Sequence, residues 1–234
     1  GRGTTAIEAA LLGRNFITND INPLSTLFVI GRLHPPSMQE ITDRLYSKIE
    51  SDTEIDKIDL SMFYQYETLK EINDLRNYFI KKKLNNYDNT DHWIKMVATN
   101  RLTGHSKGFF SVYTLPPNQA TSAKRQIQIN LKRNQTPEYK DTKEIIIKKS
   151  KQLLRNISDQ QIKNLDKVRS SSLILQTDAS KTKQIPSNSV TLTVTSPPFL
   201  DIVNYAKDNW LRCWFNNIDL ENLAKKITMS KNIE

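Results

Sequence analysis

The stretch that decides the fold is Gly1–Asp20, GRGTTAIEAALLGRNFITND. Two glycines come first, and the apolar side chains of residues 4–13 then recur at helical spacing, with Gly13 as a predicted C-terminal cap. The β-prone residues 15–19 follow and end at Asp20. A glycine loop, a helix, a strand and an acidic residue in this order predict the opening of an α/β fold.

Further along the chain, the spacing of apolar residues predicts a long and mostly helical region. The predicted helices cover residues 24–33, 37–50 and 64–84 and most of 121–168. The predicted buried stripe of the third helix consists of Leu69, Ile72, Leu75, Phe79 and Ile80. Residues 99–120 hold two of the six glycines and two of the nine prolines, so we expect an ordered loop there.

Two strands are predicted near the end of the chain, at Ser172–Thr177 and Val190–Thr195. Strand–helix alternation at both ends favours a parallel sheet with crossover helices, interrupted by an insertion of about 140 residues. The expected fold class is therefore α/β, with an incomplete doubly wound sheet and a large, mostly helical insertion. The expected division is 1–26 and 169–234 as two parts of one sheet domain, with 27–168 as the insertion.

The positive charge lies in the middle of the chain. The 234 residues carry a net charge of +9, of which residues 92–169 contribute +11 and residues 1–91 contribute −3. Such a segment suits contact with a polyanion, although a solvated helical face in a lysine-rich protein explains it equally well. The expected phosphate contacts are Arg101, Lys107 and Arg125.

Composition excludes several classes of protein. No apolar run reaches the roughly 18 residues of a membrane span, so we expect no membrane partner. Cys213 is the one cysteine, which excludes an internal disulfide and fits a reducing, cytoplasmic compartment. With three scattered histidines beside it, we expect no metal site. We interpret Cys213, Trp210 and Trp214 as packing residues of one helix. His105 is interpreted either as a residue that orders its loop or as a contact to phosphate or to a flipped base.

The first chemical motif is the glycine loop with the acidic residue that follows the strand. Gly1 and Gly3 allow the backbone to approach a cofactor at a helix N-terminus, and Asp20 can accept hydrogen bonds from ribose hydroxyls. The third glycine of the dinucleotide fingerprint is missing, which counts against NAD. An ordinary glycine-rich turn remains the alternative.

The second motif is Ser196-Pro197-Pro198-Phe199, directly after the predicted strand 190–195. The prolines fix the backbone and remove two N–H donors, which leaves carbonyl acceptors. A serine hydroxyl and a proline carbonyl can together hold an exocyclic amino group, while the phenyl ring stacks on the base that carries it. The alternative interpretation is a rigid turn that binds nothing.

Together, GRGTTAIEAALLGRNFITNDINPLS (1–25) and LILQTDASKTKQIPSNSVTLTVTSPPFLDIVNY (173–205) resemble the amino-group DNA methyltransferases that use S-adenosylmethionine. These segments cover about a quarter of the chain. The resemblance implies a Rossmann-like methyltransferase sheet, S-adenosyl-L-methionine as cofactor, and double-stranded DNA as partner. It also implies a role in DNA methylation, of the restriction-modification or an orphan type.

The resemblance also implies a role for each matching residue. Gly1 and Gly3 go to the methionine end of the cofactor, Asp20 to its ribose and Asp178 to its adenine amino group. Thr4, Thr5 and Asn22 belong to the same cofactor segment. Ser196, Pro197, Pro198 and Phe199 form the catalytic loop that holds a base flipped out of the duplex. Serine at the first loop position favours cytosine N4 over adenine N6 as the methylated atom.

The chain departs from the family pattern at both ends. The family has a strand ending in Asp-Pro-Phe before the glycine loop, and 35 residues follow Phe199 where the family has further strands. We therefore expect a missing N-terminal segment or a second polypeptide to complete the sheet. The alternatives left open are a non-catalytic nucleic-acid-binding remnant and an RNA methyltransferase.

Overall fold

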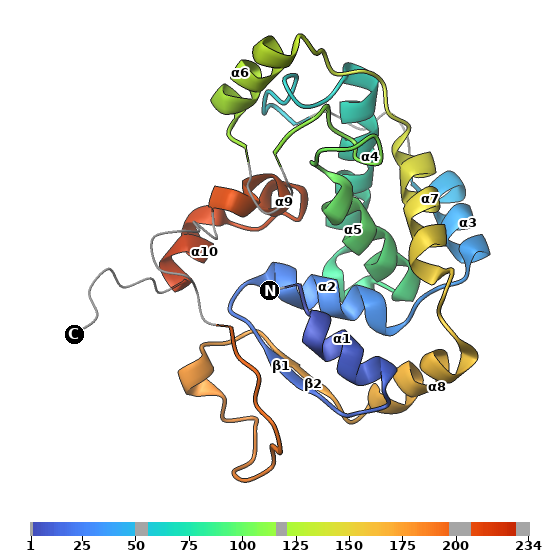
Figure 1. Cartoon of the computed structure of the whole chain (residues 1–234), viewed down its shortest axis with the longest axis vertical. Helices are drawn as coiled ribbons and strands as arrows, with labels where there is room; N and C mark the ends of the chain where they lie inside the picture. The colour runs from blue at the N-terminus through green and yellow to red at the C-terminus, as the bar shows by residue number, and fades with distance from the viewer. Residues whose placement is uncertain (1, 50–55, 116–120, 197–206, 228–234) are drawn as a thin grey trace.

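The computed structural model describes residues 2–49, 56–115, 121–196 and 207–227 (Figure 1). Helices make up most of these ranges, and they surround a small parallel sheet. They are α1 (Thr4–Leu11), α2 (Pro23–Leu33), α3 (Met38–Ser47), α4 (Tyr66–Lys82), α5 (Asn89–Arg101), α6 (Ala123–Arg133), α7 (Thr142–Leu154), α8 (Asp159–Val168), α9 (Trp210–Phe215) and α10 (Leu220–Lys226), with short 3-10 turns at η1 (Leu84–Asn86), η2 (Ala179–Lys181) and η3 (Lys207–Asn209).

The sheet joins segments that are more than 150 residues apart in the chain. Strand β1 (Ile17–Asn19) pairs in parallel with β2 (Leu173–Leu175), in the register Ile17 to Leu173. The ladder continues beyond both strands, because the Leu173 amide donates to the Phe16 carbonyl at 2.9 Å and the Asp20 amide donates to the Leu175 carbonyl at 3.3 Å. The predicted parallel pairing across a long helical insertion is confirmed, and the fold is mainly helical with this two-stranded sheet.

The prediction of a strand at 190–195 is wrong for the chain as described. These residues form no strand, and Val190, Leu192 and Val194 are 47%, 78% and 67% exposed. A strand is stabilised by ladder hydrogen bonds and by burial of at least one face. Within the described ranges, neither a neighbouring strand nor a covering helix supplies these for Val190–Thr195. The sheet is therefore narrower than the doubly wound sheet that we expected.

Two hydrophobic clusters form the core, and α2 belongs to both of them. The larger cluster packs α2–α5, α7, α9 and α10 together around Phe63, Phe79 and Ile94. The smaller one packs α1 and α8 against α2 beside the sheet. Gly31 allows α2 to lie close to α5, because a Cβ there would be 2.6 Å from the Met96 Cβ and 2.9 Å from the His92 carbonyl oxygen. Helix α2 thus connects the sheet region to the helical region.

Local signals explain most helix boundaries. Gly13 follows α1 with φ 69°, as its predicted capping role requires. Capping boxes begin α3 (Ser37 and Glu40) and α8 (Ser158 and Gln161). In α4 the predicted stripe is buried except for Ile80, which is 38% exposed, so its inclusion was wrong. Ile80 lies one position past the buried Phe79, where the helical surface turns toward solvent.

Helix α5 was not predicted, for a physical reason. Eight of its thirteen residues are buried, including Asp91, Trp93, Ile94 and Met96, so it lies in the middle of the helical region. A helix surrounded by protein has no polar face, and its sequence therefore lacks the periodic contrast that identifies a surface helix.

Helix α9 packs as expected from its aromatic residues. Trp210 and Trp214 are half-buried. The Trp210 indole donates to the Thr121 carbonyl at 3.1 Å, and the Trp214 indole donates to Asp56 at 2.9 Å. Cys213, which precedes Trp214 in the chain, is buried. Burial raises the pKa of the Cys213 thiol to about 11, which makes it unreactive. Among the described helices, none is both long enough and apolar enough to cross a membrane.

Candidate functional site

Three predicted site elements meet at one edge of the sheet. Asp20 directly follows β1, and Asp178 comes three residues after β2; because the strands are parallel, both acids lie beyond the same, carboxyl edge. The Thr177 amide donates to the Asn19 side chain at 3.0 Å, which holds the two strand ends together. Helix α1 runs antiparallel to β1, so its N-terminus is also at this edge (Figure 1).

The N-terminus of α1 is open. Gly3 precedes the helix with φ 70°, no side chain caps the first turn, and Thr4 and Thr5 are exposed there. As the N-cap, Gly3 has no side chain that could accept hydrogen bonds from the amides of this turn, and amides at helix N-termini can bind anionic or polar ligands. Gly3 also has a packing role, since a Cβ at this position would lie 2.3 Å from the Val29 Cγ2 atom.

Asp20 is held in place by its own loop. Its carboxylate accepts hydrogen bonds from the Asn22 amide at 2.9 Å and from the Ser25 hydroxyl at 2.5 Å. Partial burial alone would raise the pKa of Asp20, but hydrogen bonds that include these two lower it below its ordinary value. Asn22 in turn caps α2 by accepting from the Leu24 amide at 3.0 Å. Asp20 is thus a fixed, ionised acceptor, and Asn22 shapes the loop beside it.

Asp178 is an exposed acceptor at the same edge. Its Oδ1 accepts hydrogen bonds from the Ser180 amide and hydroxyl, both at 2.9 Å, so it begins the short turn η2. The backbone hydrogen bond from Ser180 is the main cause that lowers the pKa of Asp178. Asp20 and Asp178 therefore present two ionised carboxylates, the acceptors that ribose hydroxyls and an adenine amino group require.

Of the motif Ser196-Pro197-Pro198-Phe199, the structure describes only Ser196. Ser196 is exposed, whereas Gly1, Pro197, Pro198 and Phe199 lie outside the described residues. The predicted arrangement of the catalytic loop beside the cofactor loop therefore stays a prediction.

Four arginines from distant parts of the chain form a cationic cluster, which consists of Arg2, Arg32, Arg101 and Arg212. The Arg32 guanidinium donates to the Arg2 carbonyl, which joins the end of α2 to the start of α1. The Asn216 side chain donates to the Thr99 hydroxyl at 3.0 Å, which joins α9 to the end of α5, where Arg212 and Arg101 lie. The cluster thus gathers residues from four separate segments.

Burial and neighbouring positive charge both lower the pKa of three of these arginines. Burial and the charge of Arg2 lower the pKa of Arg32, and the same causes lower the pKa of Arg101 to about 10. Burial and the charges of Arg2 and Arg101 lower the pKa of Arg212 to about 10 as well. Within the described ranges, no ion pair involves Arg32 or Arg101. An anion that contacts this cluster would complement its positive charge.

Of the three expected phosphate contacts, the structure brings one into the cluster. Arg101 belongs to it, and its guanidinium also stacks 4.1 Å from the Phe109 ring centre. Lys107 is exposed in the loop after α5, and Arg125 is exposed on α6. Sequence reasoning missed Arg2, Arg32 and Arg212, because no local pattern relates residues that only the folded chain brings together.

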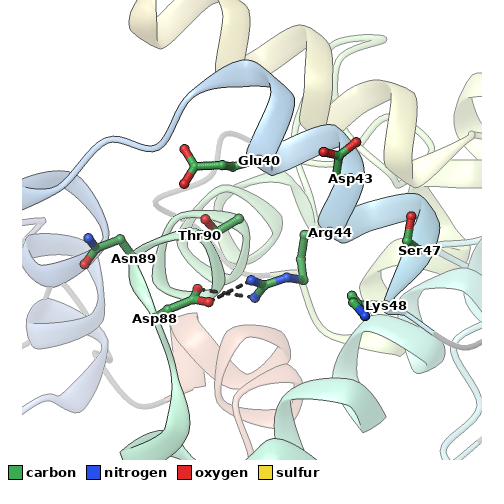
Figure 2. Close-up of a pocket in the computed structure, with 8 residues that line it drawn as sticks. All are labelled: Glu40, Asp43, Arg44, Ser47, Lys48, Asp88, Asn89 and Thr90. Atoms are coloured by element: carbon green, nitrogen blue, oxygen red, sulfur yellow. Dashed lines mark hydrogen bonds and ion pairs between the residues drawn. The ribbon is translucent and has the colours of Figure 1, made fainter.

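A pocket of about 530 Å³ lies elsewhere, between α3 and the start of α5 (Figure 2). Glu40, Asp43 and Arg44 line one wall and Asp88 and Thr90 the other. Arg44 points across the pocket and pairs with Asp88 at 2.7 Å. None of the predicted site residues lines this pocket. The Arg44–Asp88 ion pair at its centre connects α3 to the start of α5.

The described residues contain no group of three or more histidine, cysteine or acidic side chains that could hold a metal ion. Comparisons with protein-family models, with curated proteins and with solved structures returned no match for this chain.

Proposed function

We propose that this chain belongs to a DNA methyltransferase that transfers a methyl group from S-adenosylmethionine to an exocyclic amino group, with cytosine N4 favoured over adenine N6. The observation that carries the proposal is the convergence of the open α1 N-terminus, Asp20 and Asp178 at one sheet edge. Ligands of open α/β sheets bind beyond the carboxyl ends of the strands, where these groups lie.

The hydrogen-bonding groups at this edge suit the parts of S-adenosylmethionine. The first-turn amides of α1 suit its methionine carboxylate, Asp20 suits its ribose hydroxyls, and Asp178 suits its adenine amino group. Because Asp20 is already oriented by the Asn22 amide and the Ser25 hydroxyl, little conformational entropy would be lost when it binds. The bound cofactor would supply an electrophilic methyl group.

In this function, the motif Ser196-Pro197-Pro198-Phe199 holds the amino group of the target base. An exocyclic amine is a weak nucleophile while its lone pair is delocalised into the ring. Hydrogen bonds from the amine to the Ser196 hydroxyl and the Pro197 carbonyl favour a pyramidal nitrogen with a more available lone pair. Phe199 stacks on the flipped base, so alignment of the reactants supplies much of the rate.

The cationic cluster supports DNA as the substrate. Arg2, Arg32, Arg101 and Arg212 lie close to the start of α1, and hence close to the proposed cofactor site. The phosphates of a duplex would complement the positive charge of these side chains.

The test is transfer of a labelled methyl group to duplex DNA, followed by mass spectrometry of the nucleosides. We expect N4-methylcytosine, while N6-methyladenine would change the base and keep the mechanism. Ser196→Ala should lower turnover about 100- to 1,000-fold, because a hydrogen bond that strengthens in the transition state is lost, and should leave cofactor affinity unchanged. Asp20→Ala should instead weaken cofactor binding by about 1–3 kcal/mol.

Three results would contradict the proposal. A 5-methylcytosine product would require a cysteine nucleophile, and Cys213 is buried with a raised pKa. Methyl transfer to RNA but not to duplex DNA would show that the substrate is RNA. Calorimetry that shows equal cofactor affinity for the wild type and Asp20→Ala would remove Asp20 from the site.

A second candidate is a nucleic-acid-binding protein without catalysis. The exposed, unpaired Val190–Thr195 favours it, because a catalytic loop needs a fixed strand before it. DNA binding together with no detectable cofactor binding by calorimetry would select this candidate.

A further inference from the structure

Helix α6 packs Ala123 at its start against the larger cluster, and polar side chains hold the rest of it on the molecule. The fully buried Gln126 side chain donates to the Tyr113 carbonyl at 3.0 Å and to Asn130 at 2.7 Å. Asn130 donates to the Met62 carbonyl at 2.8 Å, and Gln135, just after the helix, donates to the same Tyr113 carbonyl at 3.0 Å. These directional bonds fix the rotation of α6 about its axis, so a defined face points outward.

The outward face of α6 carries cationic side chains together with amide and aliphatic side chains. Lys124, Ile127, Gln128 and Leu131 recur at the spacing of one helical face, and all four are exposed, Leu131 by 77%. Arg125 and Lys132 are exposed at its flanks. The helix carries four cationic residues and no acidic one. An unpaired apolar and cationic face of this kind is typical of a surface that binds a polyanion.

We propose that α6 enters the major groove of the DNA substrate and reads its sequence there. The proposal rests on the DNA-methyltransferase function proposed above. Eleven residues make a helix about 16 Å long, and the major groove admits a helix. Lys124, Arg125 and Lys132 contact phosphates, and Gln128 contacts the N6 and N7 atoms of an adenine.

The apolar residues of this face complete the expected base contacts. Ile127 precedes Gln128 by one position, and Leu131 follows it by three. Both are aliphatic, and such side chains contact the thymine methyl group in the major groove. The recognised site therefore includes at least one A·T pair. Arg133 is not part of this face, because its guanidinium lies 3.8 Å from the Tyr113 ring centre on the inner side.

The position of α6 connects it to the proposed site. The Trp210 indole of α9 donates to the carbonyl of Thr121, two residues before α6 begins, at 3.1 Å, and α9 also carries Arg212 of the cationic cluster. In the view of Figure 1, α9 lies between α6 and the start of α1. One duplex can therefore contact α6 and the cationic cluster together.

The first experiment compares two triple variants of equal charge by fluorescence anisotropy with a mixed-sequence duplex. One is Lys124→Ala/Arg125→Ala/Lys132→Ala, and the control is Lys148→Ala/Lys163→Ala/Lys167→Ala, whose lysines are exposed on α7 and α8. We expect the α6 variant to bind at least 10-fold more weakly and its dependence of log affinity on log salt to fall by about 2–3. The control should change affinity less than 3-fold.

The second experiment tests base reading by selection from a random duplex library. Gln128→Ala and Leu131→Ala should each lose preference at one or two adjacent A·T positions, while Gln152→Ala and Leu153→Ala, exposed on α7, should retain the wild-type preference. Circular dichroism spectra should be the same for all variants, since each substitution is on a solvent-exposed face.

Several outcomes overturn the inference. Equal weakening by both triple variants, or an unchanged sequence preference in Gln128→Ala and Leu131→Ala, would remove α6 from the interface while leaving DNA as the substrate. Binding of the wild type to vesicles of anionic lipid but not to the duplex would show that this face meets a membrane surface. A wild-type protein that binds no duplex would overturn the proposed function as well.

Discussion

Single residues at the sheet edge have structural and proposed chemical roles at the same time. Gly3 provides a left-handed conformation before α1 and also makes room for Val29. Asp20 orders its own loop through Asn22 and Ser25, and the same carboxylate is the proposed ribose acceptor. A substitution at either residue therefore changes stability as well as binding, and both must be measured.

The prediction at the residue scale concerns Gly3. Gly3→Ala should lower the free energy of unfolding by about 1–3 kcal/mol, because its Cβ would overlap Val29 and a positive φ is strained for alanine. Gly108→Ala is the matched control, since the nearest atom to a Cβ there is 4.0 Å away. Urea denaturation measures both variants, and equal stabilities would show that Val29 moves aside without cost.

At the scale of elements, a charge network around the buried Asp91 joins three helices of the insertion. Arg44 of α3 donates to Asp88 at the start of α5 and to the fully buried Asp91. Tyr78 and Lys82 of α4 also contact Asp91, the tyrosine at 2.7 Å. Every charge in the network has an opposite partner, so removal of one leaves another buried without full compensation.

We predict that Arg44→Met destabilises the protein by about 2–4 kcal/mol, because Asp91 keeps only Lys82 and Tyr78 as partners among these groups. Arg14→Met, on an exposed residue, should change stability by less than about 0.5 kcal/mol. Urea denaturation at pH 7 measures both. A loss of less than about 1 kcal/mol for Arg44→Met would show that the network contributes little to stability.

The same network predicts a pH dependence. Partial burial would raise the pKa of Asp88, but the Arg44 guanidinium lowers it to about 2, from an ordinary value of 3.8. A lowered carboxyl pKa stabilises the folded state above pH 3.8, and this stabilisation is lost as the pH falls through 2. The stability difference between the wild type and Arg44→Met should therefore shrink between pH 4 and pH 2.

At the scale of the whole molecule, exposed apolar side chains occur on several elements, among them Leu131 of α6, and three of them alternate along one segment near the end of the described residues. Two clusters joined by α2 bury most large side chains, whereas Val190, Leu192 and Val194 alternate along an exposed, extended segment. Segments with this pattern pair readily with other strands, either within a completed sheet or between molecules.

We therefore predict that Leu192→Lys leaves the free energy of unfolding within about 0.5 kcal/mol of the wild type and lowers self-association, measured by light scattering at increasing concentration. Leu175→Lys is the contrasting variant, because Leu175 is 8% exposed in β2 and a charge there should unfold the protein. If Leu192→Lys destabilises the chain as much, the segment 190–195 is buried in solution.

Features that depend on neighbours in the chain could be predicted from the amino-acid sequence. Gly13 ends α1, Ser158 begins α8, and the alternation of helix and strand around Asp20 led to the parallel pairing of β1 with β2. These signals are local, since caps and short-range periodicity involve residues only a few positions apart. The positions of Asp20 and Asp178 after β1 and β2 are local features too, whereas their roles toward a cofactor stay a prediction.

Only the tertiary structure decided the features that depend on distant residues. Helix α5 lacks a polar face because other helices surround it, and 190–195 is no strand because pairing needs a neighbour that β-propensity cannot supply. Arg2, Arg32, Arg101 and Arg212 became a cluster through the packing of α1, α2, α5 and α9. Charge repulsion acts through space, so no pattern along the chain records which of the 34 basic residues meet.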